Sequence, residues 1–149
     1  MIVLKFGGTS VENVSALENV VSIIAKEQSH KPFVVVSACA GSTNALLSIA
    51  LTAANGDYDS SVDALRKLQL GHQAIADELL LPGHRDEFSN TLRRDFESVG
   101  SVLKTCSLLR SAYPRALDFV ASHGELWSST LLYFAALERG LKTVLVDAR

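Results

Sequence analysis

The sequence predicts an α/β fold, a three-layer α/β/α sandwich with a mainly parallel sheet. Short, almost continuously apolar segments alternate along the chain with longer segments in which apolar residues recur every three or four positions. These two patterns are those of buried strands and amphipathic helices. Strands without polar alternation are typical of parallel sheets that helices cover on both faces. The length of 149 residues suits one domain with a substantial core.

The first strand–helix–strand unit begins at the N-terminus. IVLKF (2–6) and PFVVVSA (32–38) are short, β-branched or aromatic, and bounded by chain-breaking residues, which predicts two buried strands. Residues 10–29 between them form a predicted helix, with apolar residues at helical spacing at Val14, Leu17, Val20, Val21 and Ile24. A helical crossover of this kind is right-handed, and it joins strands that run parallel.

Helices predominate in the middle of the chain, as an excursion that should pack to one side between the second and last strands. The predicted helices cover residues 43–54, 60–81, 85–111 and 124–140. Turn signals separate them, at Asn55-Gly56, Pro82-Gly83, Pro114 and Gly140.

A last strand is predicted for KTVLVDA (142–148). Three parallel strands make a small sheet for this number of helices, so we expect residues 1–149 to be an incomplete part of a longer domain. The last strand would then be an exposed apolar edge, and such edges pair with other chains. We therefore expect a homo-oligomer.

Composition narrows the class of partner. The chain is 48% hydrophobic and 20% charged, as in ordinary soluble globular proteins. A net charge of −2 argues against nucleic-acid binding through a general basic field, and no apolar run is long enough to cross a membrane. Cys39 and Cys106 lack metal-ligand spacing and favour buried thiols in a reducing cytoplasm.

LKFGGTSV (4–11) joins the first strand to its helix and is the first candidate site. Ligands of open parallel sheets bind at the carboxyl ends of the strands. Gly7-Gly8 lies at that edge without side chains that would hold an anion away, the next helix N-terminus offers N–H groups, and Lys5 adds a positive charge. These features suit a phosphate, although a tight turn beside an exposed lysine explains the same residues. The spacing is neither that of a P-loop nor that of the dinucleotide fingerprint.

SACAGSTN (37–44) follows the second strand and should face the same crevice. Ser37, Ser42 and Thr43 carry hydroxyl groups that suit a small polar ligand. Thr43 is also a candidate N-cap for the next helix, so a plain capped loop is the alternative explanation.

SHGELWSS (122–129) is the third candidate. Glu125 is predicted in the first turn of a helix, where it either complements the helix dipole or binds an ammonium group. His123 has no second ligand at metal-binding spacing, so no metal site is predicted. Trp127 is interpreted as helix core.

Together these three motifs resemble the aspartate kinases of the amino acid kinase family, in order and in spacing. Kinases of glutamate, acetylglutamate, carbamate or UMP share the glycine-rich start, but not the full KFGGTSV wording or the long helical excursion. The resemblance implies transfer of the ATP γ-phosphoryl group, with Mg²⁺ brought by the nucleotide, to the β-carboxylate of L-aspartate. The product, 4-phospho-L-aspartate, leads to lysine, threonine and methionine. A kinase of another small amino acid or of carbamate is one alternative, and a non-catalytic anion-binding module is another.

The resemblance also implies roles for single residues. Lys5 would be catalytic, neutralising charge on the transferred phosphoryl group. Ser37, Thr43 and Glu125 would contact aspartate, with Glu125 at its α-ammonium group. The segment that holds the ATP phosphates would be Lys5, Phe6, Gly7, Gly8, Thr9 and Ser10. No enzyme nucleophile is required, because phosphoryl transfer depends mainly on positioning and charge stabilisation.

The family pattern also includes segments that residues 1–149 lack. These are a GRGGSD-type segment with a substrate-binding arginine, the adenine-binding half, and the regulatory ACT domains. We therefore expect this chain to be the N-terminal part of a kinase domain and to be inactive alone. A GRGGSD-like stretch after Arg149 would favour the kinase, and a stop codon would favour the binding module.

Overall fold

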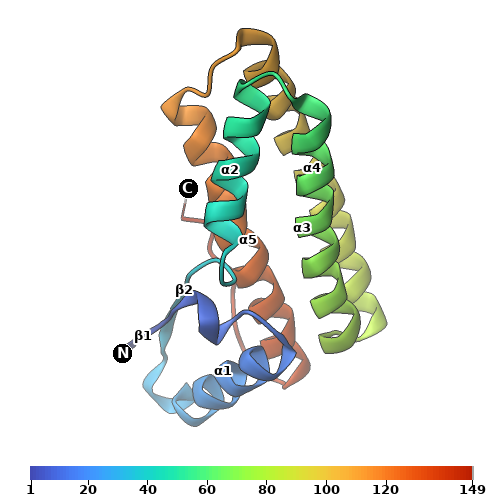
Figure 1. Cartoon of the computed structure of the whole chain (residues 1–149). Coiled ribbons are helices and arrows are strands. Elements are labelled where there is room, and N and C mark those ends of the chain that lie inside the picture. Colours follow the sequence, from blue (N-terminus) through green and yellow to red (C-terminus); the bar gives the residue numbers. More distant parts are fainter. Residues whose placement is uncertain (149) are drawn as a thin grey trace.

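A computed structural model describes residues 1–148, and Arg149 lies outside the described residues. An elongated bundle of helices α2 to α5 stands at one end, and a small sheet with helix α1 lies at the other (Figure 1). One-turn 3-10 helices follow β1, at Gly8–Ser10, and precede β2, at Gln28–His30. The other elements are β1 (Val3–Phe6), α1 (Val14–Lys26), β2 (Phe33–Val36), α2 (Ser42–Ala54), α3 (Tyr58–Leu79), α4 (Pro82–Leu109) and α5 (Pro114–Glu138).

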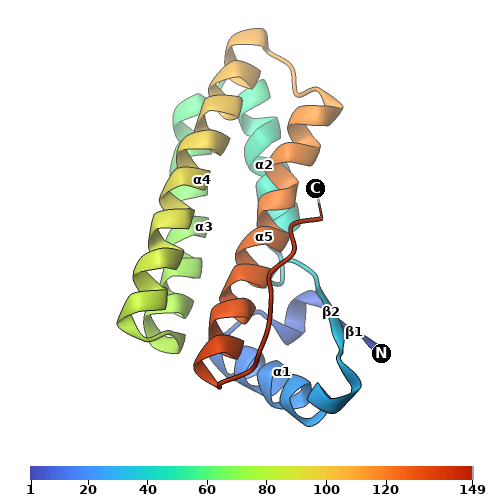
Figure 2. The same cartoon turned by 180° about the vertical axis from the view of Figure 1, so that it is seen from behind.

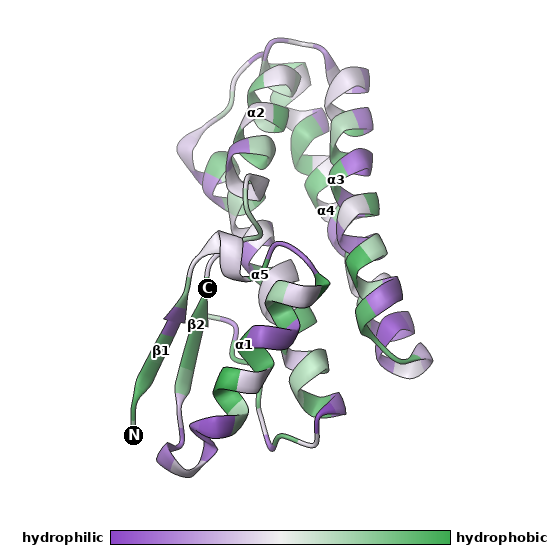
Figure 3. Cartoon of the chain, turned by 60° about the horizontal axis from the view of Figure 1, so that its bottom comes forward, coloured by the Kyte–Doolittle hydropathy of each residue, from purple (hydrophilic) through white to green (hydrophobic). Residues whose placement is uncertain are grey.

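Strands β1 and β2 pair in parallel, with Lys5 opposite Val35 and Phe6 opposite Val36. This pairing confirms the predicted strand–helix–strand unit and the α/β class. Side chains alternate between the two faces of a sheet, and here one face is half-buried while the other is exposed. Within the described residues, helical cover therefore lies on one face of the sheet. Both strands are mostly coloured as hydrophobic in Figure 3. The exposed face consists of Val3, Lys5, Phe33 and Val35.

The main core lies among the bundle helices. Trp127 of α5 and Phe88 of α4 are its largest fully buried side chains. The indole Nε1 of Trp127 donates a hydrogen bond to Asp95 Oδ2 of α4 at 2.9 Å, so its one polar group is satisfied although the ring is buried. This confirms Trp127 as a core residue. No helix within residues 1–148 is long and apolar enough to span a membrane.

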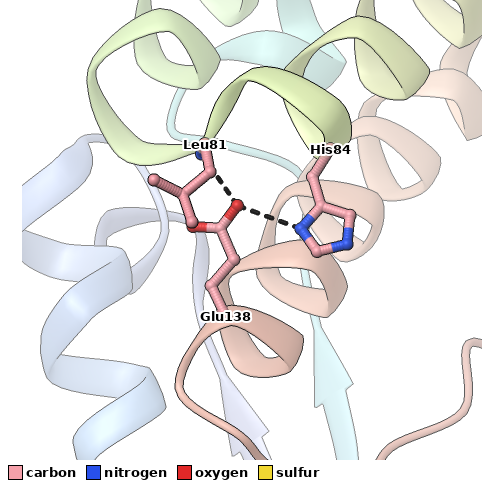
Figure 4. A network of polar contacts seen from close by, with 3 residues as sticks. All are labelled: Leu81, His84 and Glu138. Carbon is pink, nitrogen blue, oxygen red and sulfur yellow. Dashed lines mark hydrogen bonds and ion pairs between the residues drawn. The ribbon is translucent and has the colours of Figure 1, made fainter.

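Glu138, the last residue of α5, holds the turn between α3 and α4 (Figure 4). Its Oε1 accepts a hydrogen bond from the Leu81 N–H at 2.8 Å and lies 3.0 Å from His84 Nδ1. His84 also stacks on Phe134, with ring centroids 5.0 Å apart. Leu81 is the N-cap of α4, and no side-chain hydrogen bond caps this end of the helix. In a capping box, the glutamate at the third helical position accepts a hydrogen bond from the N-cap N–H. Here the Glu138 carboxylate of α5 accepts that hydrogen bond instead.

Helix α5 begins at Pro114, ten residues before the predicted start at Gly124, so the prediction that Glu125 lies in a first helical turn is wrong. The sequence predicts a helix start at Gly124, but a Cβ at this position would lie 2.7 Å from the Ala38 Cβ. The glycine therefore allows close packing and does not begin a helix. The predicted end at Gly140 is confirmed, because Gly140 has a φ of +73° and the Leu141 N–H donates to the Ala136 carbonyl, as in a Schellman motif.

The prediction of a last strand over residues 142–148 is wrong. Residues 142–148 form no regular secondary structure and follow α5 as an extended coil (Figure 2). Val144 and Val146 are 82% and 66% exposed. A run of β-branched residues indicates suitability for a sheet, but a strand forms only beside a partner. The sheet of the described residues contains β1 and β2 alone.

Candidate active site

All three sequence motifs meet at the segment Ser37–Ser42, which we call the central loop. Because β1 and β2 are parallel, the glycine loop Gly7–Ser10 and the central loop leave the same edge of the sheet. The Ser37 N–H donates to the Phe6 carbonyl at 3.1 Å, which extends the ladder to the point where the two loops diverge. The predicted shared edge is therefore present.

Gly8 is in contact with the central loop. A Cβ at Gly8 would lie 2.7 Å from the Ala38 carbonyl oxygen and 3.3 Å from the Ala40 nitrogen. A backbone oxygen cannot move aside as a flexible side chain can, so only glycine allows this approach. Gly8 therefore has a packing reason to be glycine, independent of any ligand.

Gly7 differs from its neighbour. Its backbone is extended, with φ −78° and ψ 172°, a conformation that any residue adopts. A Cβ at Gly7 would meet nothing within 4 Å. Neither conformation nor packing in the described chain accounts for glycine here, and the space beside it is open.

A 3-10 turn begins at Gly8, the second of the two glycines. The Ser10 N–H donates to the Gly7 carbonyl at 3.0 Å, and the Val11 N–H donates to the Gly8 carbonyl at 3.2 Å. Helix α1 begins later, at Val14, and its N-cap is Asn13, whose side chain accepts from the Ala16 N–H. The expectation that a long helix starts directly after the glycine pair is therefore wrong, because a 3-10 turn separates the glycine pair from α1.

Cys39 links the central loop to Val11, the residue that follows the glycine loop. Its Sγ donates a hydrogen bond to the Val11 carbonyl at 3.0 Å, and the residue is buried. Burial raises the pKa of the Cys39 thiol to about 11, so the group stays protonated and remains a donor at neutral pH. The prediction of a buried thiol is confirmed for Cys39 and also for Cys106.

Helix α5 also contacts the central loop. Gly124 packs against Ala38, and the buried Ser128 Oγ donates to the Ser37 carbonyl at 2.8 Å. Glu125 follows Gly124 and is exposed. It lies in the interior of α5, so it does not complement the dipole of a helix end.

The remaining predicted residues lie on these same elements. Lys5 is exposed on the open face of the sheet, and Ser37 is half-buried at the end of β2. Thr43 is half-buried in the first turn of α2, but the N-cap of that helix is Gly41, with a φ of +78° and no side-chain cap. Thr43 is therefore not the N-cap. Its hydroxyl is not required for capping.

His123 is a core residue. It is buried, and its Nδ1 lies 2.8 Å from the Phe119 carbonyl, one turn earlier in α5. Over residues 1–148, no group of three or more His, Cys, Asp or Glu side chains is placed to hold a metal ion.

Two cavities lie away from these motifs. One of about 240 Å³ is at the far end of the bundle and is lined by Cys106 and Tyr113. Another of about 200 Å³ lies beside Glu138. The edge where the motifs meet is an open surface formed by loops, so cavity size is a poor guide to the site in this chain.

Sequence reasoning missed three residues that join the motifs, namely Cys39, Gly124 and Ser128. Gly124 and Ser128 are four residues apart and so share one face of α5. This pair of small residues, one helical turn apart and next to the core residue Trp127, was the available signal of a close contact.

The sequence model of the amino acid kinase family matches residues 1–149. The chain is 33% identical over 145 residues to "Bifunctional aspartokinase/homoserine dehydrogenase 2, chloroplastic" of Arabidopsis thaliana, covering 97% of this chain and 16% of that protein. It is 31% identical over 149 residues to "Lysine-sensitive aspartokinase 3" of Escherichia coli K12, covering 100% of this chain and 31% of that protein. The chain thus spans less than a third of the length of these relatives.

Solved structures agree in fold. The crystal structure of E. coli aspartokinase III in complex with aspartate and ADP (R-state) aligns with a TM-score of 0.80 at 28% identity, over 100% of this chain and 31% of that chain. The complex with lysine and aspartate (T-state) aligns with a TM-score of 0.72 at 27% identity, over 95% and 30% of the two chains. With a family match over the whole sequence and this common fold, the chain belongs to the amino acid kinase family.

Proposed function

We propose that the protein carrying this chain is an aspartate kinase. It transfers the γ-phosphoryl group of ATP to the β-carboxylate of L-aspartate, giving 4-phospho-L-aspartate and ADP. The bond between the γ-phosphorus and the β,γ-bridging oxygen breaks, and a bond from that phosphorus to a carboxylate oxygen forms. The observation that carries the proposal is the meeting of three motifs on the central loop, at the carboxyl edge of parallel strands. Two aspartokinase relatives and a solved aspartokinase complex with aspartate and ADP support it.

The phosphate side of the proposed site is the segment from Lys5 to Ser10. The open space beside Gly7 favours a ligand that approaches the backbone closely, because nothing else in the described chain requires glycine there. Lys5 places a positive charge at the same sheet edge and would stabilise charge on the transferred group. Phe6 packs against the core, so its part is to fix the backbone of the loop. Mg²⁺ would arrive as part of the Mg–ATP substrate.

The aspartate side consists of Ser37, Thr43 and Glu125. Glu125 is an exposed carboxylate in the interior of α5, and its neighbour Gly124 touches the central loop that carries Ser37. With no helix-dipole role for Glu125, attraction of the substrate ammonium group is the stronger explanation. Thr43 is free of a capping role, which leaves its hydroxyl available for the substrate.

We propose further that residues 1–149 form the N-terminal part of the kinase domain, and that the whole protein works as a homo-oligomer in the cytoplasm. The partial coverage of the relatives, at 16% to 31% of their length, supports the first point. The open face of the sheet exposes Val3, Phe33 and Val35 beside Lys5, and either the rest of the domain or a second copy would cover these apolar residues, which is compatible with self-association. The names of several relatives place those proteins in chloroplasts, so a location experiment should include that compartment where the source organism has one.

The proposal is tested by assaying ADP release from Mg–ATP by the full-length protein, with L-aspartate, L-glutamate, N-acetylglutamate and carbamate as acceptors. We expect turnover with L-aspartate and an acyl phosphate that hydroxylamine traps as a hydroxamate. Preference for another acceptor would replace aspartate with that substrate. Binding of nucleotide without turnover on any acceptor would favour the anion-binding module. The 149-residue chain alone should show no turnover, because the groups needed for phosphoryl transfer act as a unit.

A further inference from the structure

We propose that Ser128 is a positioning residue that fixes the spacing between Glu125 and the central loop, an inference that rests on the proposed aspartate site. Ser128 itself is fully buried and touches no substrate. Its hydroxyl joins the two elements that contribute aspartate contacts, α5 with Glu125 and the end of β2 with Ser37.

The hydrogen bonds of Ser128 distinguish this role from ordinary helix packing. Its Oγ lies 2.8 Å from the Ser37 carbonyl and 3.1 Å from the Glu125 carbonyl within its own helix. A serine hydroxyl has one proton to donate, and the shorter distance assigns it to Ser37. The bond therefore spans two elements, although a serine inside a helix usually bonds only to its own preceding turn.

Gly124 supplies the second point of contact between the same two elements. It lies one turn before Ser128, and a Cβ there would come within 2.7 Å of the Ala38 Cβ. One turn of α5 therefore contacts two consecutive residues of the central loop, because Gly124 packs against Ala38 and Ser128 bonds to Ser37. Two contacts a turn apart fix both the rotation and the height of α5 relative to β2. Glu125 lies inside that turn.

The expected consequence is selective. Removing the Ser128 hydroxyl lets the turn that carries Glu125 shift relative to Ser37 and Thr43, and small displacements of binding groups are costly. The glycine loop would be less affected, because its links to the central loop are made separately, by Cys39 and by the Gly8 contact. Aspartate binding should therefore weaken while nucleotide binding is retained.

The matched pair for the test is Ser128→Ala and Ser129→Ala in the full-length protein. Ser129 is the next residue of α5, and its Oγ donates to the Leu126 carbonyl of the same helix at 3.0 Å. We expect Ser128→Ala to raise the aspartate KM about tenfold and to leave the ATP KM within about twofold of wild type. Ser129→Ala should leave both constants unchanged. Ser128→Cys keeps a weak donor and should fall between wild type and Ser128→Ala.

An unchanged aspartate KM in Ser128→Ala overturns the inference and leaves the proposed function intact. Equal rises in both KM values, with a lower melting temperature and no recovery in Ser128→Cys, also overturn it, because they indicate a purely structural serine. If the wild-type protein itself does not phosphorylate aspartate, the proposed function fails, and the inference fails with it.

Discussion

The two ends of this molecule are built in opposite ways. The helical bundle is closed by large side chains, with Trp127 and Phe88 fully buried. The sheet end depends on small residues that allow close approach, because Gly8 packs against the Ala38 carbonyl oxygen and Gly124 of α5 packs against the Ala38 side chain. One face of that sheet remains open, with Phe33 55% exposed. Stability should therefore depend mainly on the bundle, and function on the sheet end. The following substitutions test this division.

Trp127→Ala should have the largest effect, and on stability. It removes a buried ring and its hydrogen bond to Asp95, and truncation of a buried aromatic residue costs about 3–5 kcal/mol. Urea denaturation measures this loss. Leu70→Ala, at a 60% exposed position of α3, is the control and should change little. A loss for Trp127→Ala below about 1 kcal/mol would show that the bundle is not the main source of stability.

Lys5→Ala should affect catalysis with little effect on stability. Loss of one preorganised charge at developing transition-state charge lowers kcat about 10²–10³-fold. The side chain is exposed, so the melting temperature should stay near that of wild type. Lys26→Ala, at the exposed end of α1, serves as the charge-matched control. Near wild-type kcat in Lys5→Ala would remove this residue from the mechanism.

Glu125→Gln keeps the size of the side chain and removes its charge. If the carboxylate binds the substrate ammonium group, the loss of a charged hydrogen bond of about 1.5–3 kcal/mol raises the aspartate KM roughly 10- to 100-fold. The ATP KM and the melting temperature should not change, because Glu125 is exposed and lies far from the ends of α5. Glu97→Gln, on the exposed side of α4, is the control. A change in stability without a change in KM would contradict the binding role.

The adjacent glycines should separate packing from binding. Gly8→Ala places a Cβ against the Ala38 oxygen, and overpacking of this kind costs about 1–3 kcal/mol. Gly7→Ala meets no neighbour, so its stability should equal that of wild type while nucleotide affinity falls. Calorimetry with ATP and one melting curve for each variant make the comparison. Unaltered ATP affinity in Gly7→Ala would leave this glycine without a ligand role.

The smallest expected effect is a pH dependence of the bundle. Burial lowers the pKa of His72 from its ordinary value of 6.5, against a weaker opposite effect of its hydrogen bond to the Leu68 carbonyl. As the pH decreases below 6.5, the unfolded chain therefore binds the proton more readily than the folded chain. The free energy of unfolding decreases as the pH decreases. One group contributes at most about 1.4 kcal/mol per pH unit. His72→Phe should flatten this slope between pH 6.5 and 5. An unchanged slope would assign it to other groups.

Local patterns predicted the parts of the fold that depend on local chemistry. The runs IVLKF and PFVVVSA predicted β1 and β2, and the Gly140 signal predicted the end of α5. The start of α5 was missed because Gly124 looks like a breaker in sequence, whereas its reason is the distant Ala38. The last strand was missed because strand pairing is a tertiary property.

The same distinction holds at the candidate site. The glycine loop, the central loop and Glu125 can be identified from sequence, because glycine, hydroxyl or acidic residues stand next to the predicted ends of strands and helices. The residues that join them do not. Ser128 and Ser37 are 91 positions apart, and Cys39 and Val11 are 28 apart. A hydrogen bond between such residues leaves no periodicity or spacing in the sequence.

Trp127 has a practical consequence for measurements on the 149-residue chain. It is the single tryptophan of the sequence, it lies edge-on to His72 with ring centroids 5.0 Å apart, and it precedes Ser128 in α5. In the 149-residue chain, its fluorescence is therefore an intrinsic optical probe at the junction of the two ends of the molecule, with no label to add. Emission that shifts to the red would report opening of the bundle. Quenching without a spectral shift, as the pH falls, would report a charged imidazole beside the ring.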